Sequence, residues 1–165
     1  MIKNLNNMTK QKLTKGEINF KALKFLRSQN TMVLASISNN LEPQAATVYF
    51  VCDEHFNLFF MTSKDSKKAE NLKINGKVAF VIGWGPQVIT IQGGGVAKEL
   101  DKREAETFID LIKKNDFESA NQWPLLKLAK EGYITFKITP LWMTYLNMEK
   151  VKHPNIASSE FYKII

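Results

Sequence analysis

The sequence predicts a mainly β protein, a small antiparallel barrel of six to seven strands with flanking helices. Short apolar runs follow one another across brief polar turns, which is typical of antiparallel strands. The regular alternation of strands and helices that a parallel α/β sheet needs is missing. With 165 residues, 44% of them hydrophobic, the chain is long enough for one domain with a sizeable core.

The N-terminal part of the chain divides into a polar segment and a helix. Residues 1–16 are mostly polar, and we expect them to be flexible, as chain termini often are. Apolar residues at helical spacing then predict a helix over residues 17–28. No linker, repeat or low-complexity block interrupts the chain after this segment, so residues 17–165 are expected to form a single domain.

Apolar runs separated by turn residues predict the strands. The first five strands are expected over residues 31–37, 45–52, 57–61, 77–83 and 87–96. The fifth contains the glycine run Gly93–Gly95, which permits a bulge or a sharp bend. Two final strands are expected over residues 133–139 and 142–148, joined at Pro140, and the tail after Met148 receives no assignment.

Three further helices are expected between the strands. Residues 65–74 form a short helix for which Asp65 or Ser63 is a suitable N-cap. Residues 101–115 begin with acidic side chains, end with lysines and carry an apolar stripe, all of which favour a helix. Residues 123–130 have a third helical pattern.

The formal net charge of +7 raises the question of a nucleic-acid ligand, because lysine and arginine neutralise phosphates. Only Arg27 and Arg103 are arginines, however, although base readout depends heavily on arginine. No helix-turn-helix, zinc-finger or RNA-recognition pattern occurs. A solvated basic surface is the favoured interpretation, and a basic nucleic-acid-associated protein stays as a less favoured alternative.

Several features of the sequence concern the compartment. No apolar run approaches the roughly 20 residues that span a bilayer. The N-terminal residues lack the apolar segment and cleavage pattern of a secretory signal. Cys52 is the single cysteine, so an internal disulfide is excluded, which suits a reducing compartment. We therefore expect a cytoplasmic protein.

The common signatures of metal and nucleophile chemistry are weak. Cys52 and His55 flank a turn but lack a second pair of ligands, so no metal site is expected. No G-x-S-x-G motif occurs, and QGGGV is not the G-x-G-x-x-G fingerprint of a dinucleotide site. Trp84 and Trp142 could stack on a ring system, although each is more often a core or interface residue.

Hydroxyl and lysine side chains gather where the third predicted strand meets the short helix, in the segment TSKDSKKA. A phosphate binds to hydroxyl donors, fixed positive charge and the free amides of a helix N-terminus. This segment supplies the first two through Thr62, Ser63, Ser66, Lys64, Lys67 and Lys68. Lysine is unfavourable in the first turn of a helix unless an anion offsets it. The segment therefore indicates a phosphate site, with an ordinary capped helix followed by exposed lysines as the alternative.

This segment and three further runs of the sequence resemble one known family. The three runs are LKFLRSQNTMVLASISNNLEPQAATVYFVC, ITIQGGGVAKEL and ITFKITPLWMTYLNM. They are similar to the pyridoxamine 5'-phosphate oxidase-like flavoproteins, which have the FMN-binding split barrel. The resemblance extends from Glu17 to Met148, and its most specific part is the T-x-x-x-S-x-K pattern of Thr62, Ser66 and Lys68. It implies a split β-barrel that binds FMN and forms a homodimer with the flavin at the subunit interface.

The resemblance also implies a set of cofactor-binding residues. The phosphate would lie at the T-x-x-x-S-x-K segment, the flavin ring along the second strand and the start of the fifth, and the third strand beside the ring. The residues at these positions are Thr62, Ser66, Lys67 and Lys68 for the phosphate, and Ala46, Thr47, Val48, Gln87, Val88, Phe60 and Met61 for the ring.

Two departures from the family separate this chain from the true oxidases. Those enzymes carry an arginine on the second strand that binds the phosphate, and Ala46 occupies this position here. They also carry a C-terminal segment with arginine and histidine that binds the pyridoxal substrate, and KVKHPNIASSEFYKII has no such pattern. The resemblance therefore implies a short, general-stress-protein-like member, an FMN-dependent oxidoreductase for an unidentified small molecule. No catalytic residue is assigned.

Two alternatives for the cofactor stay open. Some split-barrel relatives bind haem through a histidine in their C-terminal part, and His153 is the residue here that could do so. Such a protein would bind haem or flavin without turnover of its own. Other members prefer a deazaflavin to FMN, which the sequence does not exclude.

Overall fold

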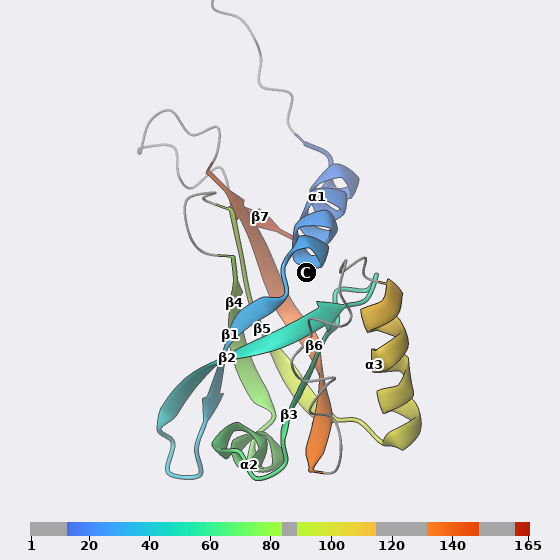
Figure 1. Cartoon of the computed structure of the whole chain (residues 1–165). Coiled ribbons are helices and arrows are strands. Elements are labelled where there is room, and N and C mark those ends of the chain that lie inside the picture. Colours follow the sequence, from blue (N-terminus) through green and yellow to red (C-terminus); the bar gives the residue numbers. More distant parts are fainter. Residues whose placement is uncertain (1–12, 84–88, 115–131, 149–160) are drawn as a thin grey trace, which may run out of the picture.

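The computed structural model describes residues 13–83, 89–114, 132–148 and 161–165 (Figure 1). The elements in chain order are α1 (Lys15–Ser28), β1 (Thr31–Ile37), β2 (Pro43–Cys52), β3 (Leu58–Ser63), α2 (Lys67–Ile74), β4 (Lys77–Ile82), β5 (Ile89–Glu99), α3 (Lys102–Lys114), β6 (Tyr133–Asn147) and β7 (Phe161–Lys163). None of the helices in these residues is long and apolar enough to cross a membrane.

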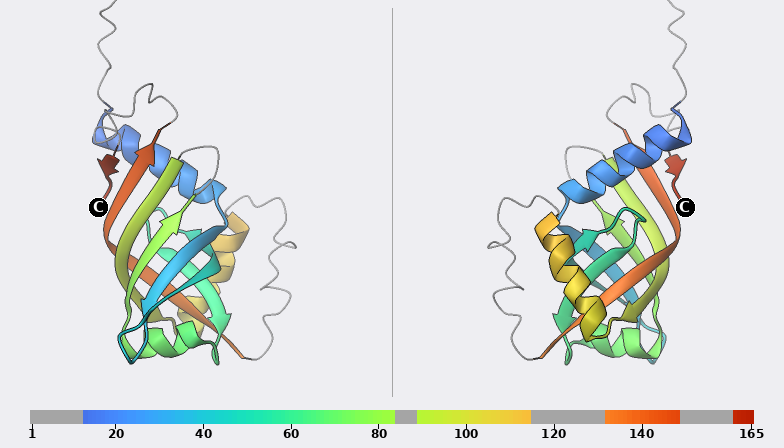
Figure 2. Two further views of the ribbon diagram at one scale, coloured as in Figure 1. Left: turned by 90° about the vertical axis from the view of Figure 1, so that its left-hand side faces the viewer. Right: turned by 90° about the vertical axis from the view of Figure 1, so that its right-hand side faces the viewer.

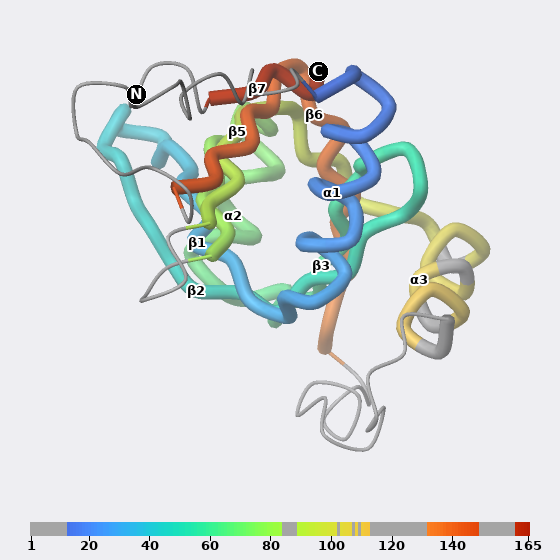
Figure 3. The backbone as a smooth tube through the Cα atoms, turned by 90° about the horizontal axis from the view of Figure 1, so that it is seen from above, coloured from blue at the N-terminus to red at the C-terminus, as the bar shows by residue number. Residues whose placement is uncertain are grey.

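The strands form a closed barrel. Their order in the sheet is β3-β2-β1-β4-β5-β6-β7, and a further pairing of β3 with β6 closes six of them into a ring. Every pair of neighbours is antiparallel. Figure 3, which looks along the barrel, shows this ring with α3 outside it. The predicted antiparallel barrel of six to seven strands with flanking helices is thus confirmed, with β7 as an extra strand beside the ring.

The three helices lie at different places around the barrel. In both views of Figure 2, α1 crosses one end of the barrel, α2 lies at the opposite end, and α3 stands along the side. A capping box explains where α1 begins, because Thr14 Oγ1 accepts from the Glu17 amide while the Glu17 carboxylate accepts from the Thr14 amide. The backbone hydrogen bond from Thr14 also holds the pKa of Glu17 below its ordinary value.

The alternation of side chains along the strands builds the core. In β1 every second residue is buried, and β4 alternates in the same way. The inward side chains form one large cluster inside the barrel, which α1 and α2 extend through Leu26 and Leu72. A second, smaller cluster lies between α3 and the outer face of β2 and β3, where Phe108 and Ile112 pack against Val51 and Phe59.

The barrel is split between β2 and β3. These strands pair only at the register positions Phe50↔Phe60, Val51↔Phe59 and Cys52↔Leu58 within the described residues. Beyond them β2 continues along β1 as far as Pro43, whereas β3 continues along β6 as far as Ser63. The two strands therefore diverge toward the end of the barrel where α2 lies (Figure 1).

One strand assignment from the sequence was wrong. Residues 133–139 and 142–148 do not form two strands, because β6 runs without interruption through Pro140. Proline has no amide hydrogen, so a continuous ladder would lose a bond there. The register shifts at this point, with Gly95 opposite Pro140 and Gly94 opposite Trp142, so that Leu141 is the extra residue of a bulge.

Other boundaries differ less from prediction. α1 begins at Lys15, inside the segment expected to be flexible, and β5 extends to Glu99. The N-cap of α2 is Ser66 rather than Asp65 or Ser63. The helix predicted over residues 123–130 lies outside the described residues.

Candidate functional site

The site begins where β3 ends and α2 starts. Ser66 has an extended backbone, and its hydroxyl oxygen accepts a hydrogen bond from the Ala69 amide at 3.3 Å. Serine is favoured at this position because its side chain satisfies one of the free amides of the first turn. The first two helical residues are Lys67 and Lys68, so two positive charges stand at the positive end of the α2 dipole.

Three side chains meet in this turn and form what we call the hydroxyl–lysine cluster: Thr62, Ser66 and Lys68. The hydroxyl oxygens of Thr62 and Ser66 lie 3.1 Å apart, and Lys68 Nζ donates to Thr62 Oγ1 at 3.2 Å. Thr62 is buried, while Ser66 and Lys68 are partly exposed. The cluster therefore gathers two hydroxyl groups and one ammonium group at a helix N-terminus, which are the groups that bind a phosphate.

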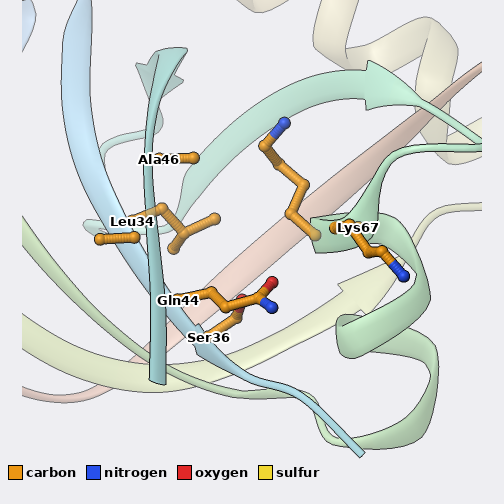
Figure 4. A pocket seen from close by; sticks show the side chains of 7 residues that line it. Leu34, Ser36, Gln44, Ala46 and Lys67 are labelled. Carbon is orange, nitrogen blue, oxygen red and sulfur yellow. The ribbon is translucent and has the colours of Figure 1, made fainter. Parts of the chain in front are cut away.

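A cavity of about 170 Å³ opens beside this cluster (Figure 4). Its lining residues come from β1, β2 and the first turn of α2: Leu34, Ser36, Gln44, Ala45, Ala46, Lys67 and Lys68. It lies on the part of β2 that has left β3. For comparison, an apolar protein cavity of about 150 Å³ holds a benzene molecule, so a group the size of a phosphate fits this one.

The two lysines at the start of α2 differ in their surroundings. Lys67 Nζ lies 3.4 Å from a Glu70 carboxylate oxygen, and its side chain is 80% exposed. In Figure 4 this side chain extends away from Ser36 and Gln44. Lys68, by contrast, is directed at the Thr62 hydroxyl. Lys68 is therefore the lysine whose charge belongs to the cluster.

A buried polar network lies at the other side of the cavity, formed by Ser36, Gln44 and Asn71. Ser36 and Gln44 are direct neighbours across β1 and β2, and Asn71 reaches them from α2. Asn71 Nδ2 donates to Ser36 Oγ at 3.2 Å and to Gln44 Oε1 at 2.9 Å. Both Asn71 and Ser36 are buried. The network fixes α2 relative to the two strands that carry the cavity.

The sequence profile of the pyridoxamine 5'-phosphate oxidase family matches residues 19–147, which is most of the chain. The chain belongs to this family. A curated pyridoxine/pyridoxamine 5'-phosphate oxidase from Alcanivorax borkumensis is 33% identical over 82 residues, which are 48% of this chain and 38% of that enzyme. The chain thus aligns with well under two thirds of this relative.

Solved structures share the fold at low sequence identity. General Stress Protein 26 from Bacillus anthracis matches with a TM-score of 0.61 and 23% identity, covering 88% of this chain and 97% of that one. The haem storage protein HutZ from Vibrio cholerae matches with a TM-score of 0.58 and 15% identity, covering 74% of this chain and 89% of that one. The fold of this chain is therefore also the fold of a protein that stores haem.

The structure brings together three of the four predicted phosphate residues of this family member and part of its predicted ring site, whereas the Lys67 ammonium group lies beside Glu70. Ala46 lines the same cavity as Lys67 and Lys68, and the Thr62 and Ser66 hydroxyls join Lys68 in the hydroxyl–lysine cluster. Gln87, Val88 and His153 lie outside the described residues.

The other predicted ring residues point in different directions. Val48 and Phe60 are buried in the barrel core, where Phe60 stacks on Phe136. Thr47 is exposed on the opposite face of β2, and the Met61 side chain packs against the small cluster under α3. If a flavin ring lies between the diverging parts of β2 and β3, Phe60 and Met61 therefore face it only with their backbone groups.

Sequence reasoning missed Ser36, Gln44 and Asn71. Ser36 occupies an inward position of β1, in line with the buried Met32 and Leu34. A polar residue at a position where strand alternation demands an apolar one is the signal that could have identified it. Nothing local pointed to Asn71, because its partners are 27 and 35 residues away in the sequence.

Cys52, at the end of β2, is a buried titratable group of the barrel. Burial raises the pKa of the Cys52 thiol to about 11, despite the nearby positive charge of Arg27. Cys52 belongs to the barrel core and does not line the cavity. No group of three His, Cys, Asp or Glu side chains suited to a metal ion occurs among the residues that the structure describes.

Proposed function

We propose that this protein binds FMN, with the phosphate of the flavin at the hydroxyl–lysine cluster, and that it is an oxidoreductase for a small molecule. The observation that carries the proposal is the meeting of the Thr62 and Ser66 hydroxyls with Lys68 Nζ at the N-terminus of α2, beside a cavity. Membership of the pyridoxamine 5'-phosphate oxidase family supports it.

The residues present fit a phosphate group. The cluster offers two hydroxyl donors, an ammonium group and the free amides of the first turn of α2. None of the described residues that line the cavity has a carboxylate, so a dianion would meet no like charge from them. Without a ligand, the lysines at the positive end of the helix dipole are unfavourable, and a bound phosphate offsets this cost.

Bound FMN would supply the redox chemistry itself, as a hydride or single-electron carrier. The chain would bind and orient it. Thr62, Ser66 and Lys68 would hold the phosphate from the α2 side of the cavity, and the divergence of β2 from β3 leaves Ala45 and Ala46, with small side chains, along the opening. Tyr145 of β6 has a titratable side chain, but this side chain is buried in the core and does not line the opening.

The vitamin B6 oxidase reaction is not part of the proposal. Ala46 offers a methyl group where the oxidases are expected to have an arginine, so the phosphate loses a bidentate donor. The chain also aligns with only 38% of the curated oxidase. A different small-molecule substrate is the better interpretation.

A homodimer belongs to the same proposal. Five residues that pair with one another across β2, β1, β4, β5 and β6 form a row on the outer face of the barrel. They are Ala45, Ala35, Ala79, Gly94 and Trp142. The next level holds Thr47, Val33, Val81, Gln92 and Thr144. Neither row carries a charge, although the chain has a net charge of +7. We infer that two copies of the chain meet on this uncharged face, and a second copy there would reach the cavity at Ala45.

The test is a titration of the purified full-length chain with FMN, followed by quenching of flavin fluorescence. The variant Lys68→Gln removes the charge of the cluster, and Lys24→Gln is the matched control because Lys24 is exposed on α1, at the other end of the barrel, and does not line the cavity. We expect saturable binding by the wild type and the control, and binding weakened by at least about tenfold in Lys68→Gln, the size of one charge-assisted hydrogen bond.

The visible spectrum of the purified protein separates the cofactors. A flavin spectrum agrees with the proposal. A Soret band that disappears in His153→Ala would instead establish the haem-binding alternative. If neither cofactor binds the wild type, or if the two lysine variants bind FMN equally well, FMN is not held at this cluster.

A further inference from the structure

The network of Ser36, Gln44 and Asn71 has a hydrogen-bonding polarity that extends into the cavity. Asn71 is only 3% exposed, and both hydrogens of its Nδ2 are used, one by Ser36 Oγ and one by Gln44 Oε1. An amide nitrogen has two hydrogens to donate. One lone pair of Ser36 Oγ and one of Gln44 Oε1 are therefore directed at Asn71.

The donors of Ser36 and Gln44 are left over. Gln44 Oε1 accepts from Asn71, and the Nε2 group of the same amide carries two N–H groups that have no hydrogen-bond partner among the described residues. The Ser36 hydroxyl accepts from Asn71 and keeps its own proton for another acceptor. Ser36 is buried, and both residues line the cavity. Figure 4 shows the two side chains next to each other.

The other described residues that line the cavity supply no acceptor side chain. Lys67 and Lys68 carry positive charges, and Leu34, Ala45 and Ala46 are apolar. A cavity lined by N–H, O–H and ammonium groups selects a ligand group that has several acceptor oxygens and negative charge. A phosphate has both properties, and a sugar hydroxyl or an uncharged ring does not.

We propose that Gln44 and Ser36, oriented by Asn71, are specificity-determining residues that donate hydrogen bonds to the phosphate of the bound flavin and so select the phosphorylated cofactor over riboflavin. This inference rests on the proposed function. In this arrangement Gln44 supplies neutral donors from β2, on the same strand where Ala46 supplies none.

The experiment compares dissociation constants for FMN and for riboflavin, which lacks the phosphate, in the full-length chain. Gln44→Ala removes the donor, and we expect FMN binding about tenfold weaker with riboflavin binding changed by less than about twofold. Gln44→Glu keeps the shape but places a carboxylate in the cavity, and we expect FMN binding weaker by about a hundredfold with riboflavin again little changed. Gln29→Glu is the control for added charge, because Gln29 is the C-cap of α1 and does not line the cavity.

Inorganic phosphate provides a second readout that needs no flavin. By linkage, a ligand that binds the folded state raises its melting temperature. We expect phosphate to raise the Tm of the wild type and of Gln29→Glu, and not that of Gln44→Glu. An Asn71→Asp variant, in which the oriented donors are lost while the cavity keeps its size, should have a preference for FMN over riboflavin about tenfold smaller than that of the wild type.

The outcomes separate this inference from the proposed function. If the wild type binds neither FMN nor riboflavin, the proposed function fails and the inference fails with it. If FMN binds, but Gln44→Ala and Gln44→Glu leave the FMN-to-riboflavin ratio unchanged or behave like Gln29→Glu, flavin binding stands and the role of Gln44 is refuted. Equal phosphate-induced Tm shifts in Gln44→Glu and the wild type refute it as well.

Discussion

The hydroxyl oxygens of Thr62 and Ser66 lie 3.1 Å apart, one at the end of a strand and the other at the cap of a helix. This contact gives Ser66 two roles, because the same hydroxyl that faces Thr62 also accepts from the Ala69 amide. Substitutions at Ser66 can separate the capping role from the proposed phosphate-binding role.

Ser66→Ala is expected to lower the free energy of unfolding by about 1 kcal/mol, the usual cost of losing an N-cap, and to weaken FMN binding. Ser66→Asp should keep the stability, because aspartate caps a helix as well as serine does, yet weaken FMN binding by at least about tenfold through repulsion between the carboxylate and the phosphate. Urea unfolding and FMN titration measure the two effects. Tight FMN binding by Ser66→Asp would show that the phosphate is bound elsewhere.

A substitution at Ala46 is expected to strengthen FMN binding. Ala46 contributes only a methyl group to a cavity of about 170 Å³ that also contains Lys68. Ala46→Arg should strengthen FMN binding by about tenfold, because a guanidinium forms bidentate charge-assisted hydrogen bonds with phosphate, and should leave riboflavin binding unchanged. Ala46→Leu fills the cavity without donors and should weaken FMN binding. A parallel loss in both variants would mean that Ala46 is required for its small size alone.

The elements that the sequence predicts well are those whose signals are local. The alternation in TMVLASI predicts β1 with the bounds that the structure has, and the spacing of Thr62, Ser66 and Lys68 along the chain is short enough for a turn to bring them together. β6 was predicted less well, because a proline argues against a continuous strand unless a bulge accommodates it. The glycine run of the neighbouring strand does indicate a bulge or bend, and the structure has one at Gly94/Gly95, but no local pattern reveals that it lies opposite Pro140.

The candidate site was predicted from the sequence at the start of α2 and at Ala46 of β2, whereas the network of Ser36, Gln44 and Asn71 was not. The donors of Ser36 and Gln44 reach the cavity because β1 and β2 pair in one particular register and because Asn71 lies opposite them. Register and helix placement are products of the whole barrel. A polar residue on an inward position raises the question of a site, but its partners become visible only in three dimensions.

The glycine run in β5 gives a prediction about stability. A Cβ on Gly95 would clash with the backbone oxygen of Thr139, whereas a Cβ on Gly94 would meet the indole of Trp142. Trp142 is 46% exposed and can move aside. We expect Gly95→Ala to cost about 1 to 3 kcal/mol, the range for overpacking, and Gly94→Ala to cost less than about 1 kcal/mol. Chemical unfolding of both variants checks the order, and a larger cost at Gly94 would contradict it.

Cys52 predicts how stability changes at alkaline pH. Burial raises the pKa of its thiol from 9.0 to about 11, so the folded state keeps the thiol protonated where the unfolded chain ionises it. Stability from this group is full below pH 9 and falls as the pH rises toward 11, at up to about 1.4 kcal/mol per pH unit. Because lysines and tyrosines also titrate there, the measurement is the difference in unfolding free energy between the wild type and Cys52→Val across this range. A pH-independent difference would refute the prediction.

The uncharged outer face predicts the oligomeric state and its dependence on one small residue. Ala79 is exposed on β4 at the middle of the row that runs from Ala45 to Trp142. If a second copy packs on this face, Ala79→Glu places an unpaired charge inside a dry contact, and burial of such a charge is costly enough to dissociate a dimer. Light scattering after size-exclusion chromatography should give a dimer for the wild type and a monomer for Ala79→Glu.

Asn40→Glu, in the exposed turn between β1 and β2, is the control for added charge and should remain dimeric. Because the cavity shares Ala45 with this face, the monomeric variant should also bind FMN more weakly, whereas a monomeric wild type that binds FMN tightly would show that one copy of the chain makes the whole site.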